Sequence, residues 1–395
     1  MTGAMTREGP LRIVRLANFV TPSSGGLRTA LAALGAGYRA AGHEPVLVVP
    51  GEVYRDERTV QGRVITLPGT PLPATGGYRV LADRRRTARL LESLAPDRLE
   101  VSDRTTLRWT GEWARRARVP AVMVSHESVD GVLGTWGVPD GAARKAADRL
   151  NRRTALSYSR VVCTTVWAER EFTRIGARNV VRAPLGVDLD RRRPGLGSAA
   201  LRARWAAPGE TLLALCSRLS VEKGAGTALD ALAALRRRGE PAVLVVAGDG
   251  PLRSRLAERA RAERLPVTFL GHLADPDEVA ALQATADLCL APGPVETFGL
   301  AALEALACGT PVVAHAGSAL PAIVGAGGAV AAGDGAAFAD AARALLARPE
   351  AARRAAARAR AERFGWAPAI EAFLAAHGAE VLTAATRRRP RGAAA

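Results

Sequence analysis

The sequence predicts an α/β protein with two doubly wound parallel-sheet domains that face a central cleft. Its 395 residues are enough for two domains of ordinary size. Short β-type runs alternate with helix-type segments in the first half, and the alternation restarts after a stretch rich in Pro and Gly. The apolar content of 48% and the mean hydropathy of +0.03 are typical of globular proteins.

The first domain is predicted over residues 1–190. It opens with a strand, a Gly-containing loop, a helix and a second strand, which together form a βαβ unit. Two later apolar runs predict buried parallel strands. The segments are strands at 11–17, 45–49, 120–125 and 160–164, a loop at 21–26 and a helix from Leu27 to Ala41.

The second domain is predicted over residues 191–365, after a polar linker at 191–198. A helix at 366–384 is expected to pack back on the first domain, and 385–395 to form a basic flexible tail. Within the second domain, strands are predicted at 211–216, 242–247, 267–270, 287–290 and 311–314, with helices at 227–238 and 251–263.

The chain is strongly basic, with a formal net charge of +17 that comes almost entirely from arginine. Such a surface can bind nucleic acid, an anionic membrane or a phosphorylated ligand, but a genomic bias toward arginine explains it equally well. No aromatic platform or zinc-finger spacing accompanies the charge, so we predict no nucleic-acid partner. The sequence does not predict an oligomeric state.

A cytoplasmic location is predicted, with peripheral contact at the inner face of the cell membrane as an option. The first residues contain no apolar signal-peptide core, and no run approaches the ~20 apolar residues of a membrane helix. The four cysteines show no C-x-x-C spacing and are expected to be buried free thiols: Cys163, Cys216, Cys289 and Cys308.

Two cations follow the first strand of the second domain. Arg218 and Lys223 lie between that strand and the next helix, where they can bind a diphosphate. Lys223 is one of only two lysines in the chain, which favours a site that needs a compact charge. An exposed charged turn is the alternative. Gly248, after the next strand, is interpreted as part of a tight turn that lines the same cleft.

The first domain offers two weaker candidates. Gly25 and Gly26 precede a helix, where backbone amides can approach an anion without a Cβ in the way. Glycine pairs are also common in ordinary turns. His126 ends a predicted strand and is expected to face the cleft, although most isolated histidines are structural.

Two acids flank an apolar run in the second domain. Glu296 precedes a helix predicted from Phe298 to Ala307, and Glu304 lies about two turns inside it. The amides of Phe298, Gly299 and Leu300 are predicted donors at the positive helix end, so an anion can bind there. The carboxylates can accept hydrogen bonds from sugar hydroxyls. An ordinary helix glutamate is the alternative for Glu304.

Together these residues resemble the retaining glycosyltransferases of family 4, which have the GT-B fold of two Rossmann-like domains. The match extends over nearly the whole chain, with Ser217 standing where the family often has glycine. The family's paired glutamates, phosphate-binding Arg and Lys, Gly-rich first loop and first-domain histidine match Glu296, Glu304, Arg218, Lys223, Gly25-Gly26 and His126.

Finer features are similar to the actinobacterial phosphatidylinositol mannoside α-mannosyltransferases that use GDP-mannose. The resemblance implies transfer of mannose to a phosphorylated lipid acceptor at the cytoplasmic membrane face. These features are segments 17–19, 24–29, 75–79, 99–104, 124–127, 162–165 and 184–188.

The resemblance also implies a direct, retaining mechanism without a protein nucleophile. The catalytic residues would be His126, Glu296, Arg218 and Lys223. The donor would be bound by Gly25, Gly26, Arg218, Lys223, Gly248, Glu296, Thr297, Phe298, Gly299, Leu300 and Glu304.

No cofactor or metal is expected beyond the GDP-mannose substrate. Asp188 with Asp190, and Asp275 with Asp277, have the D-x-D spacing of metal-dependent transferases but not their fold context. Arg218 and Lys223 already supply positive charge for a diphosphate.

Two other functions remain open at this point. One is a nucleotide-sugar-dependent transferase that acts on a soluble small molecule or natural product. The other is a non-catalytic protein that binds nucleotide sugars or polyanions. The helix around Arg84, Arg85, Arg86 and Arg89 bears on the choice, because with Leu81, Leu90 and Leu91 it could lie on anionic lipid. A solvated basic face is the alternative.

Overall fold

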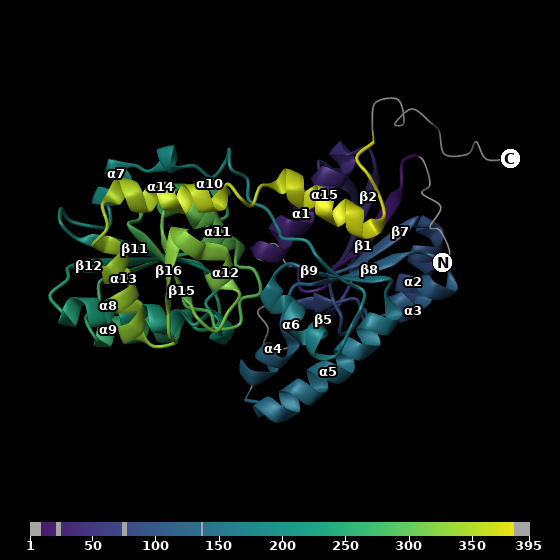
Figure 1. Cartoon of the computed structure of the whole chain (residues 1–395), viewed down its shortest axis with the longest axis horizontal. Coiled ribbons are helices and arrows are strands. Elements are labelled where there is room, and N and C mark those ends of the chain that lie inside the picture. Colours follow the sequence, from purple (N-terminus) through teal and green to yellow (C-terminus); the bar gives the residue numbers. More distant parts are fainter. Residues whose placement is uncertain (1–8, 21–24, 73–76, 136, 383–395) are drawn as a thin grey trace. The chain divides into compact units, whose positions relative to one another are not determined.

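The computed structural model describes residues 9–20, 25–72, 77–135 and 137–382. The chain forms two compact units (Figure 1). The first takes Met1–Asp130, Pro139–Pro184 and Trp366–Ala395, and the second takes Gly131–Val138 and Leu185–Gly365. The predicted tail at 385–395 lies outside the described residues.

The chain enters the second unit earlier than the predicted boundary at residue 191. Val187 already forms a parallel bridge with Gly365, and its N–H donates to the carbonyl oxygen of Phe364 at 2.8 Å. This backbone pairing joins Val187 to the last residues of the second unit. The boundary therefore lies at Leu185.

The first unit contains an eight-stranded sheet in the order β10-β9-β8-β7-β1-β2-β4-β3. Its neighbouring strands are parallel except β3 and β4, which pair antiparallel at one edge. A separate pair joins β5 (Thr70–Pro71) to β6 (Arg79–Val80). The sheet strands are β1 (Arg12–Leu16), β2 (Glu44–Gly51), β3 (Arg55–Thr59), β4 (Gly62–Pro68), β7 (Arg98–Val101), β8 (Ala121–Ser125), β9 (Arg160–Cys163) and β10 (Val180–Arg182).

Helices cover both faces of this sheet (Figure 1). Each face of the sheet has its own apolar core. Val14 of β1 belongs to the cluster that also holds Phe172. Ala17, just after β1, belongs to a second cluster with Leu31 of α1. The helices that lie wholly in this unit are α1 (Gly26–Ala40), α2 (Arg84–Leu94), α3 (Trp109–Arg116), α5 (Asp140–Ser157), α6 (Val166–Arg174) and α15 (Trp366–His377). Helix α4 (Val129–Thr135) begins in the first unit, and its residues from Gly131 belong to the second.

The C-terminal helix α15 packs beside α1 within the first unit (Figure 1). Gly37 permits the approach, because a Cβ there would lie 2.2 Å from Cδ1 of Ile370. His377 of α15 reaches the sheet, with Nε2 at 3.0 Å from Oε2 of Glu100. Arg98 Nε also donates to the His377 carbonyl oxygen at 2.7 Å. Polar and apolar contacts together hold this helix on the first unit.

The second unit contains a six-stranded parallel sheet in the order β13-β12-β11-β14-β15-β16. The chain starts in the middle, runs outward to β13, and resumes at β14 on the other side of β11. The loops after β11 and β14 therefore diverge at a topological switch point, the usual ligand position in such sheets. The strands are β11 (Thr211–Cys216), β12 (Ala242–Ala247), β13 (Val267–Gly271), β14 (Leu288–Ala291), β15 (Val312–His315) and β16 (Gly328–Ala331).

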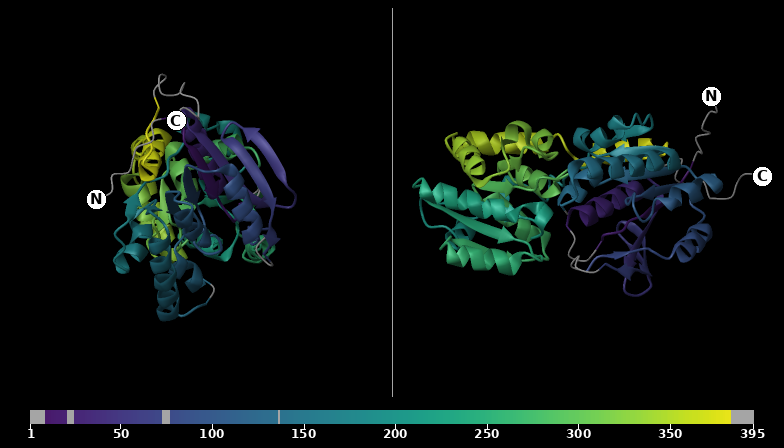
Figure 2. Two further views of the ribbon diagram at one scale, coloured as in Figure 1. Left: turned by 90° about the vertical axis from the view of Figure 1, so that its right-hand side faces the viewer. Right: turned by 90° about the horizontal axis from the view of Figure 1, so that it is seen from below.

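Helices also lie on both faces of the second sheet (Figure 2). One core joins Leu229 of α8 and Phe338 of α13 to Leu244 of the sheet. The α-helices are α7 (Ala199–Ala203), α8 (Ala225–Arg237), α9 (Arg253–Ala262), α10 (Pro276–Thr285), α11 (Leu300–Ala307), α12 (Leu320–Val324), α13 (Gly335–Leu346) and α14 (Glu350–Ala361). Short 3₁₀ turns occupy Pro194–Leu196, Val221–Lys223 and Gly325–Gly327.

The two parallel-sheet units confirm the predicted fold class. The sequence did not reveal β3, because Arg-Asp-Glu-Arg-Thr is a polar run. Four of its five residues are exposed at the sheet edge, where charged side chains are tolerated and discourage further pairing.

Candidate functional site

The loops at the switch point of the second sheet bring two predicted site residues together. Lys223 follows β11 and Glu296 follows β14, and Lys223 Nζ forms an ion pair with Glu296 Oε1. Their side chains keep 31% and 20% of their exposure, so the pair is open to solvent and to a ligand. Arg218 lies half-buried in the same loop as Lys223.

Glycines allow these two loops to pack closely. Gly224 caps α8 with φ of +63°, and a Cβ there would lie 2.6 Å from the carbonyl oxygen of Pro292. At Gly293, a Cβ would lie 3.2 Å from the carbonyl oxygen of Glu222. Larger residues would push apart the loops that carry Lys223 and Glu296.

Helix α11 begins at Leu300 and not at the predicted Phe298. Gly299 adopts φ of +77° as its N-cap, and a Cβ there would lie 2.2 Å from Cδ2 of Leu320. Within the described residues, the amides of Phe298, Gly299 and Leu300 donate to no acceptor. Thr297 and Phe298 are both buried. These amides point to an anion site at a helix start.

Glu304, inside α11, has a partner that the sequence did not indicate. Its Oε1 lies 3.2 Å from Nη2 of Arg192. Arg192 is only 7% exposed and also donates to the carbonyl oxygen of Pro276 at 2.8 Å. The sequence predicts an exposed linker at this position, since a run of arginines beside Pro and Gly is typical of exposed chain, and the burial of Arg192 shows that this prediction is wrong for this residue.

The Glu304 carboxylate is incompletely paired. Burial raises its pKa, and Arg192 offsets only part of that effect. Burial also raises the pKa of Cys216 to about 12, and the nearby charge of Glu304 contributes. Since Cys216 ends β11, Glu304 lies beside the start of the loop that carries Arg218 and Lys223. Glu304 therefore lies near the switch point and keeps acceptor capacity beyond its contact with Arg192.

Gly248 has a structural reason to be glycine. Its φ is +150°, and a Cβ would lie 1.8 Å from the carbonyl oxygen of Ser217. Its N–H already donates to the carbonyl oxygen of Gly271 at 2.7 Å. Gly248 thus sets the packing of the β11 and β12 loop ends, and its amide is not available to a ligand.

The first unit places His126 at the carboxyl end of β8. Its Nε2 lies 3.2 Å from the Ser102 hydroxyl, which follows β7. Burial lowers the pKa of His126 to about 4, so the imidazole is neutral at neutral pH. Gly25 caps α1 and Gly26 begins it, after β1. A Cβ at Gly25 would meet no described atom within 4 Å.

No group of three or more His, Cys, Asp or Glu that could hold a metal occurs in the described part of the chain. The acids of the two D-x-D segments contact backbone amides and an arginine. Asp275 accepts from the Asp277 amide at 2.9 Å, and Asp277 pairs with Arg191 at 2.5 Å. Asp188 accepts from the Arg191 amide at 2.9 Å.

The apolar side of the basic helix α2 faces the core of the first unit and not an outside surface. Leu81 and Leu91 are buried in the core of the first unit, and Leu90 packs against it. Only the arginine face remains outside, which matches the solvated-face alternative. Insertion of this helix into lipid through those leucines would require the core to open.

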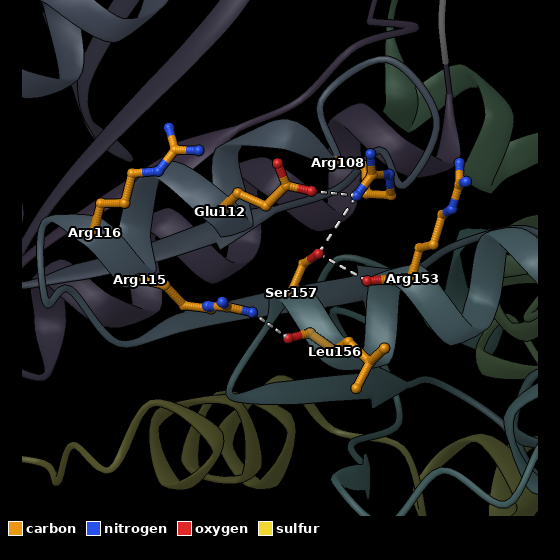
Figure 3. Close-up of a pocket in the computed structure, with 7 residues that line it drawn as sticks. All are labelled: Arg108, Glu112, Arg115, Arg116, Arg153, Leu156 and Ser157. Atoms are coloured by element: carbon orange, nitrogen blue, oxygen red, sulfur yellow. Dashed lines mark hydrogen bonds and ion pairs between the residues drawn. The ribbon is translucent and has the colours of Figure 1, made fainter.

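A second basic surface lies between α3 and α5 (Figure 3). It surrounds a hollow of about 720 Å³ in the first unit. Glu112 pairs with Arg108 at 2.7 Å, and Arg115 donates to the Leu156 carbonyl oxygen at 3.0 Å. The Leu156 side chain is 75% exposed. We call the lining residues the α3–α5 pocket: Arg108, Glu112, Arg115, Arg116, Arg153, Leu156 and Ser157.

Both units match glycosyltransferase family models. Residues 25–186 match the glycosyl transferase 4-like domain, and residues 199–362 match glycosyl transferases group 1. A GDP-mannose-dependent α-(1-6)-phosphatidylinositol dimannoside mannosyltransferase from Mycobacterium tuberculosis is 54% identical over 78% of this chain and 81% of its own. The chain belongs to this family of glycosyltransferases. The resemblance predicted from the sequence is thereby confirmed.

More distant members of the glycosyltransferase family share the same span. A GDP-mannose-dependent α-mannosyltransferase of Mycobacterium tuberculosis is 28% identical over 77% of this chain and 79% of its own. Among solved structures, sucrose-phosphate synthase from Thermosynechococcus elongatus has a TM-score of 0.74 at 22% identity, covering 91% of this chain and 96% of that one. Anabaena HepE in complex with UDP and glucose has a TM-score of 0.73 at 18% identity, covering 92% and 98%. These structures agree with a GT-B glycosyltransferase fold.

Among its described residues, this glycosyltransferase has no helix long and apolar enough to cross a membrane. All four cysteines are free thiols, and Cys216 alone among them is only half-buried.

Proposed function

We propose that this glycosyltransferase moves mannose from GDP-mannose to a hydroxyl of a phosphatidylinositol mannoside, with retention of anomeric configuration. The observation that carries the proposal is the pairing of Lys223 with Glu296 at the switch point, beside the unbonded amides at the start of α11. It stands in a chain 54% identical to a relative named for this donor and this acceptor class.

In the proposed donor complex, Lys223, Arg218 and the amides of Phe298 to Leu300 bind the diphosphate. They stabilise the negative charge that grows on it as the bond to the sugar breaks. Glu296 would then exchange part of its ion pair for hydroxyls of the mannose. Glu304, held by Arg192, would accept from the ribose hydroxyls.

His126 acts on the acceptor side in this proposal. Because burial keeps it neutral, it can hydrogen-bond a sugar without adding positive charge to the site. The acceptor oxygen bonds to the anomeric carbon on the face that GDP leaves, while the bond from that carbon to the diphosphate oxygen breaks. The hydroxyl proton passes to the departing diphosphate oxygen, so no protein nucleophile is required. We propose that no metal takes part, since Arg218 and Lys223 supply the charge; activity should then persist in excess EDTA.

We further propose peripheral contact with anionic lipid through the α3–α5 pocket, on the cytoplasmic membrane face. Arg116 and Arg153 make no side-chain hydrogen bond or ion pair within the described residues, and Leu156 is exposed beside them. Free guanidinium groups next to an apolar side chain suit a phospholipid surface.

Sedimentation with vesicles tests this contact. Wild type should pellet with phosphatidylglycerol vesicles and not with phosphatidylcholine vesicles, and Arg116→Gln with Arg153→Gln should weaken pelleting several-fold. A control with Arg237→Gln and Arg255→Gln removes the same charge from exposed positions of the second unit. Equal loss in both double variants would mean that total charge, and not this pocket, decides binding.

The main proposal is tested with GDP-mannose labelled in the sugar and phosphatidylinositol dimannoside as acceptor. Labelled glycolipid with an α-anomeric linkage should form, with UDP-glucose far less active as donor. Lys223→Ala should lower kcat/KM by about 10²–10³, as expected for loss of a charge that stabilises the transition state. Transfer to soluble acceptors alone, or binding without release of GDP, would contradict the proposal.

A further inference from the structure

Glu127 follows His126 at the carboxyl edge of the first sheet. Its main chain is fixed by a buried residue, because the Arg104 guanidinium donates to the Glu127 carbonyl oxygen. Ser125 Oγ donates to the same oxygen at 3.3 Å. Residue 127 is thus held in place independently of its own side chain.

Arg104 is itself held firmly. It is 2% exposed, and its Nη1 donates to Asn151 Oδ1 at 3.1 Å. Its Nη2 lies 3.1 Å from Glu171 Oε2. Since Glu171 is the carboxylate paired with this arginine, Arg104 serves the strand-end backbone and does not neutralise Glu127 by an ion pair.

Neighbouring carboxylates at this edge all have donors. Asp103 accepts from Asn18 Nδ2 at 2.8 Å and from the Thr105 amide at 2.7 Å. Glu171 accepts from the Ser128 hydroxyl at 3.0 Å as well as from Arg104. These acids are structural, because their acceptor capacity is used inside the unit.

The Glu127 carboxylate differs from both. Within the described residues it receives no hydrogen bond and no ion pair, although the side chain is half-buried. Burial raises the pKa of Glu127; Arg104 opposes this rise, and Asp103 and Glu171 add to it. A half-buried carboxylate without donors is unfavourable by itself and gains from any ligand that brings hydroxyls.

We propose that Glu127 binds the acceptor, accepting hydrogen bonds from sugar or inositol hydroxyls and so orienting the attacking hydroxyl beside His126. This inference rests on the proposed function. The ligand class is a neutral polyol, because a carboxylate among other carboxylates repels phosphate. The acceptor's phosphate must therefore lie away from Glu127.

Steady-state kinetics with separate variation of donor and acceptor test this role. Glu127→Gln is nearly isosteric and should raise the KM for phosphatidylinositol dimannoside at least tenfold, with the KM for GDP-mannose changed less than twofold. Glu127→Ala should have the larger effect. Glu92→Gln, an exposed change on α2, should match wild type in both constants.

Acceptor analogues separate contact from mere structural support. For a set of mono-deoxy mannoside acceptors, the analogue that lacks the hydroxyl bound by Glu127 should react equally well with wild type and Glu127→Gln. If every analogue loses the same factor, or if both substrates' KM values rise together, Glu127 does not bind the acceptor. A wild type inactive with GDP-mannose would instead overturn the proposed function, so the two failures are distinct.

Discussion

Glu100 in the first unit and Glu304 in the second each pair with a buried arginine, but the two carboxylates differ in how many donors they receive. Glu100 in the first unit accepts from Arg15 Nε at 2.8 Å and from the Tyr38 hydroxyl at 2.8 Å, with His377 Nε2 at 3.0 Å. Glu304 in the second unit has Arg192 alone among the described residues.

The electrostatic consequence has opposite signs in the two units. Burial opposes the charge of Glu100, yet Arg15 and His377 outweigh it and hold the pKa far below its usual value. Burial raises the pKa of Glu304, which one arginine does not overcome. A fully bonded carboxylate supports the fold, whereas one with unused acceptors is available to a ligand.

Replacing Glu100 should give the largest effect and should act on stability. Glu100→Gln leaves Arg15 buried without its counter-charge, and loss of one partner of a buried pair costs about 3–5 kcal/mol. Urea unfolding should show this loss, while kcat per folded molecule stays near wild type at low temperature.

Glu112→Gln is the control for this experiment, because it removes a half-exposed pair with Arg108. Such a pair contributes less than about 1 kcal/mol. If Glu100→Gln were no more destabilising than Glu112→Gln, the structural role of the Glu100 cluster would be refuted.

Replacing Glu304 should reverse the pattern. Glu304→Gln keeps a hydrogen-bond acceptor for Arg192, so its unfolding free energy should change much less than that of Glu100→Gln. Hydrogen bonds to charged groups contribute about 1.5–3 kcal/mol, so kcat/KM for GDP-mannose should fall by roughly 10- to 100-fold. A large stability loss with normal donor kinetics would reclassify Glu304 as structural.

Arg192→Lys sharpens the same point with a smaller effect. Lysine keeps the charge but cannot donate to Glu304 and the Pro276 carbonyl oxygen in the same planar arrangement. We expect about a tenfold rise in the KM for GDP-mannose, measured with acceptor held constant. Arg191→Lys, at the exposed neighbouring position, should leave that KM unchanged.

The smallest effect is a difference in pH dependence. The depressed pKa of Glu100 stabilises the fold above its unfolded pKa of about 4.3, and that stability is lost as pH falls toward the folded pKa. The raised pKa of Glu304 favours the fold below the unfolded pKa, and that contribution is lost as pH rises through the folded pKa.

Unfolding free energies from pH 4 to pH 7 measure both slopes. Over that range the deficit of Glu100→Gln relative to wild type should grow. The stability of Glu304→Gln relative to wild type should rise instead. Parallel curves for the two variants would show that the carboxylates are in equivalent environments.

The sequence predicted those parts of the site that local patterns encode. The strands that precede His126, Lys223 and Glu296 could be predicted because each apolar run stops at a polar loop. The start of α11 was misplaced because Gly299 takes a left-handed φ that a single glycine letter does not specify. The packing role of Gly248 could not be predicted from the sequence either. It depends on close contact with Ser217, which follows a different strand.

Arg192 and Glu127 mark the limit of local reasoning. Arg192 is one of three consecutive arginines, and only the fold determines which of them turns inward to Glu304. Glu127 is distinguished from Asp103 and Glu171 by the donors it lacks, which depend on residues far apart in the sequence. How the candidate residues act in catalysis stays a prediction.

Titration calorimetry with GDP-mannose tests the central claim that the incompletely bonded carboxylate of the second unit belongs to the donor site. Wild type and Glu100→Gln, kept folded at low temperature, should bind with the same Kd, and Glu304→Gln should bind at least tenfold more weakly. Equal weakening in both variants, or unchanged binding by Glu304→Gln, would contradict the account.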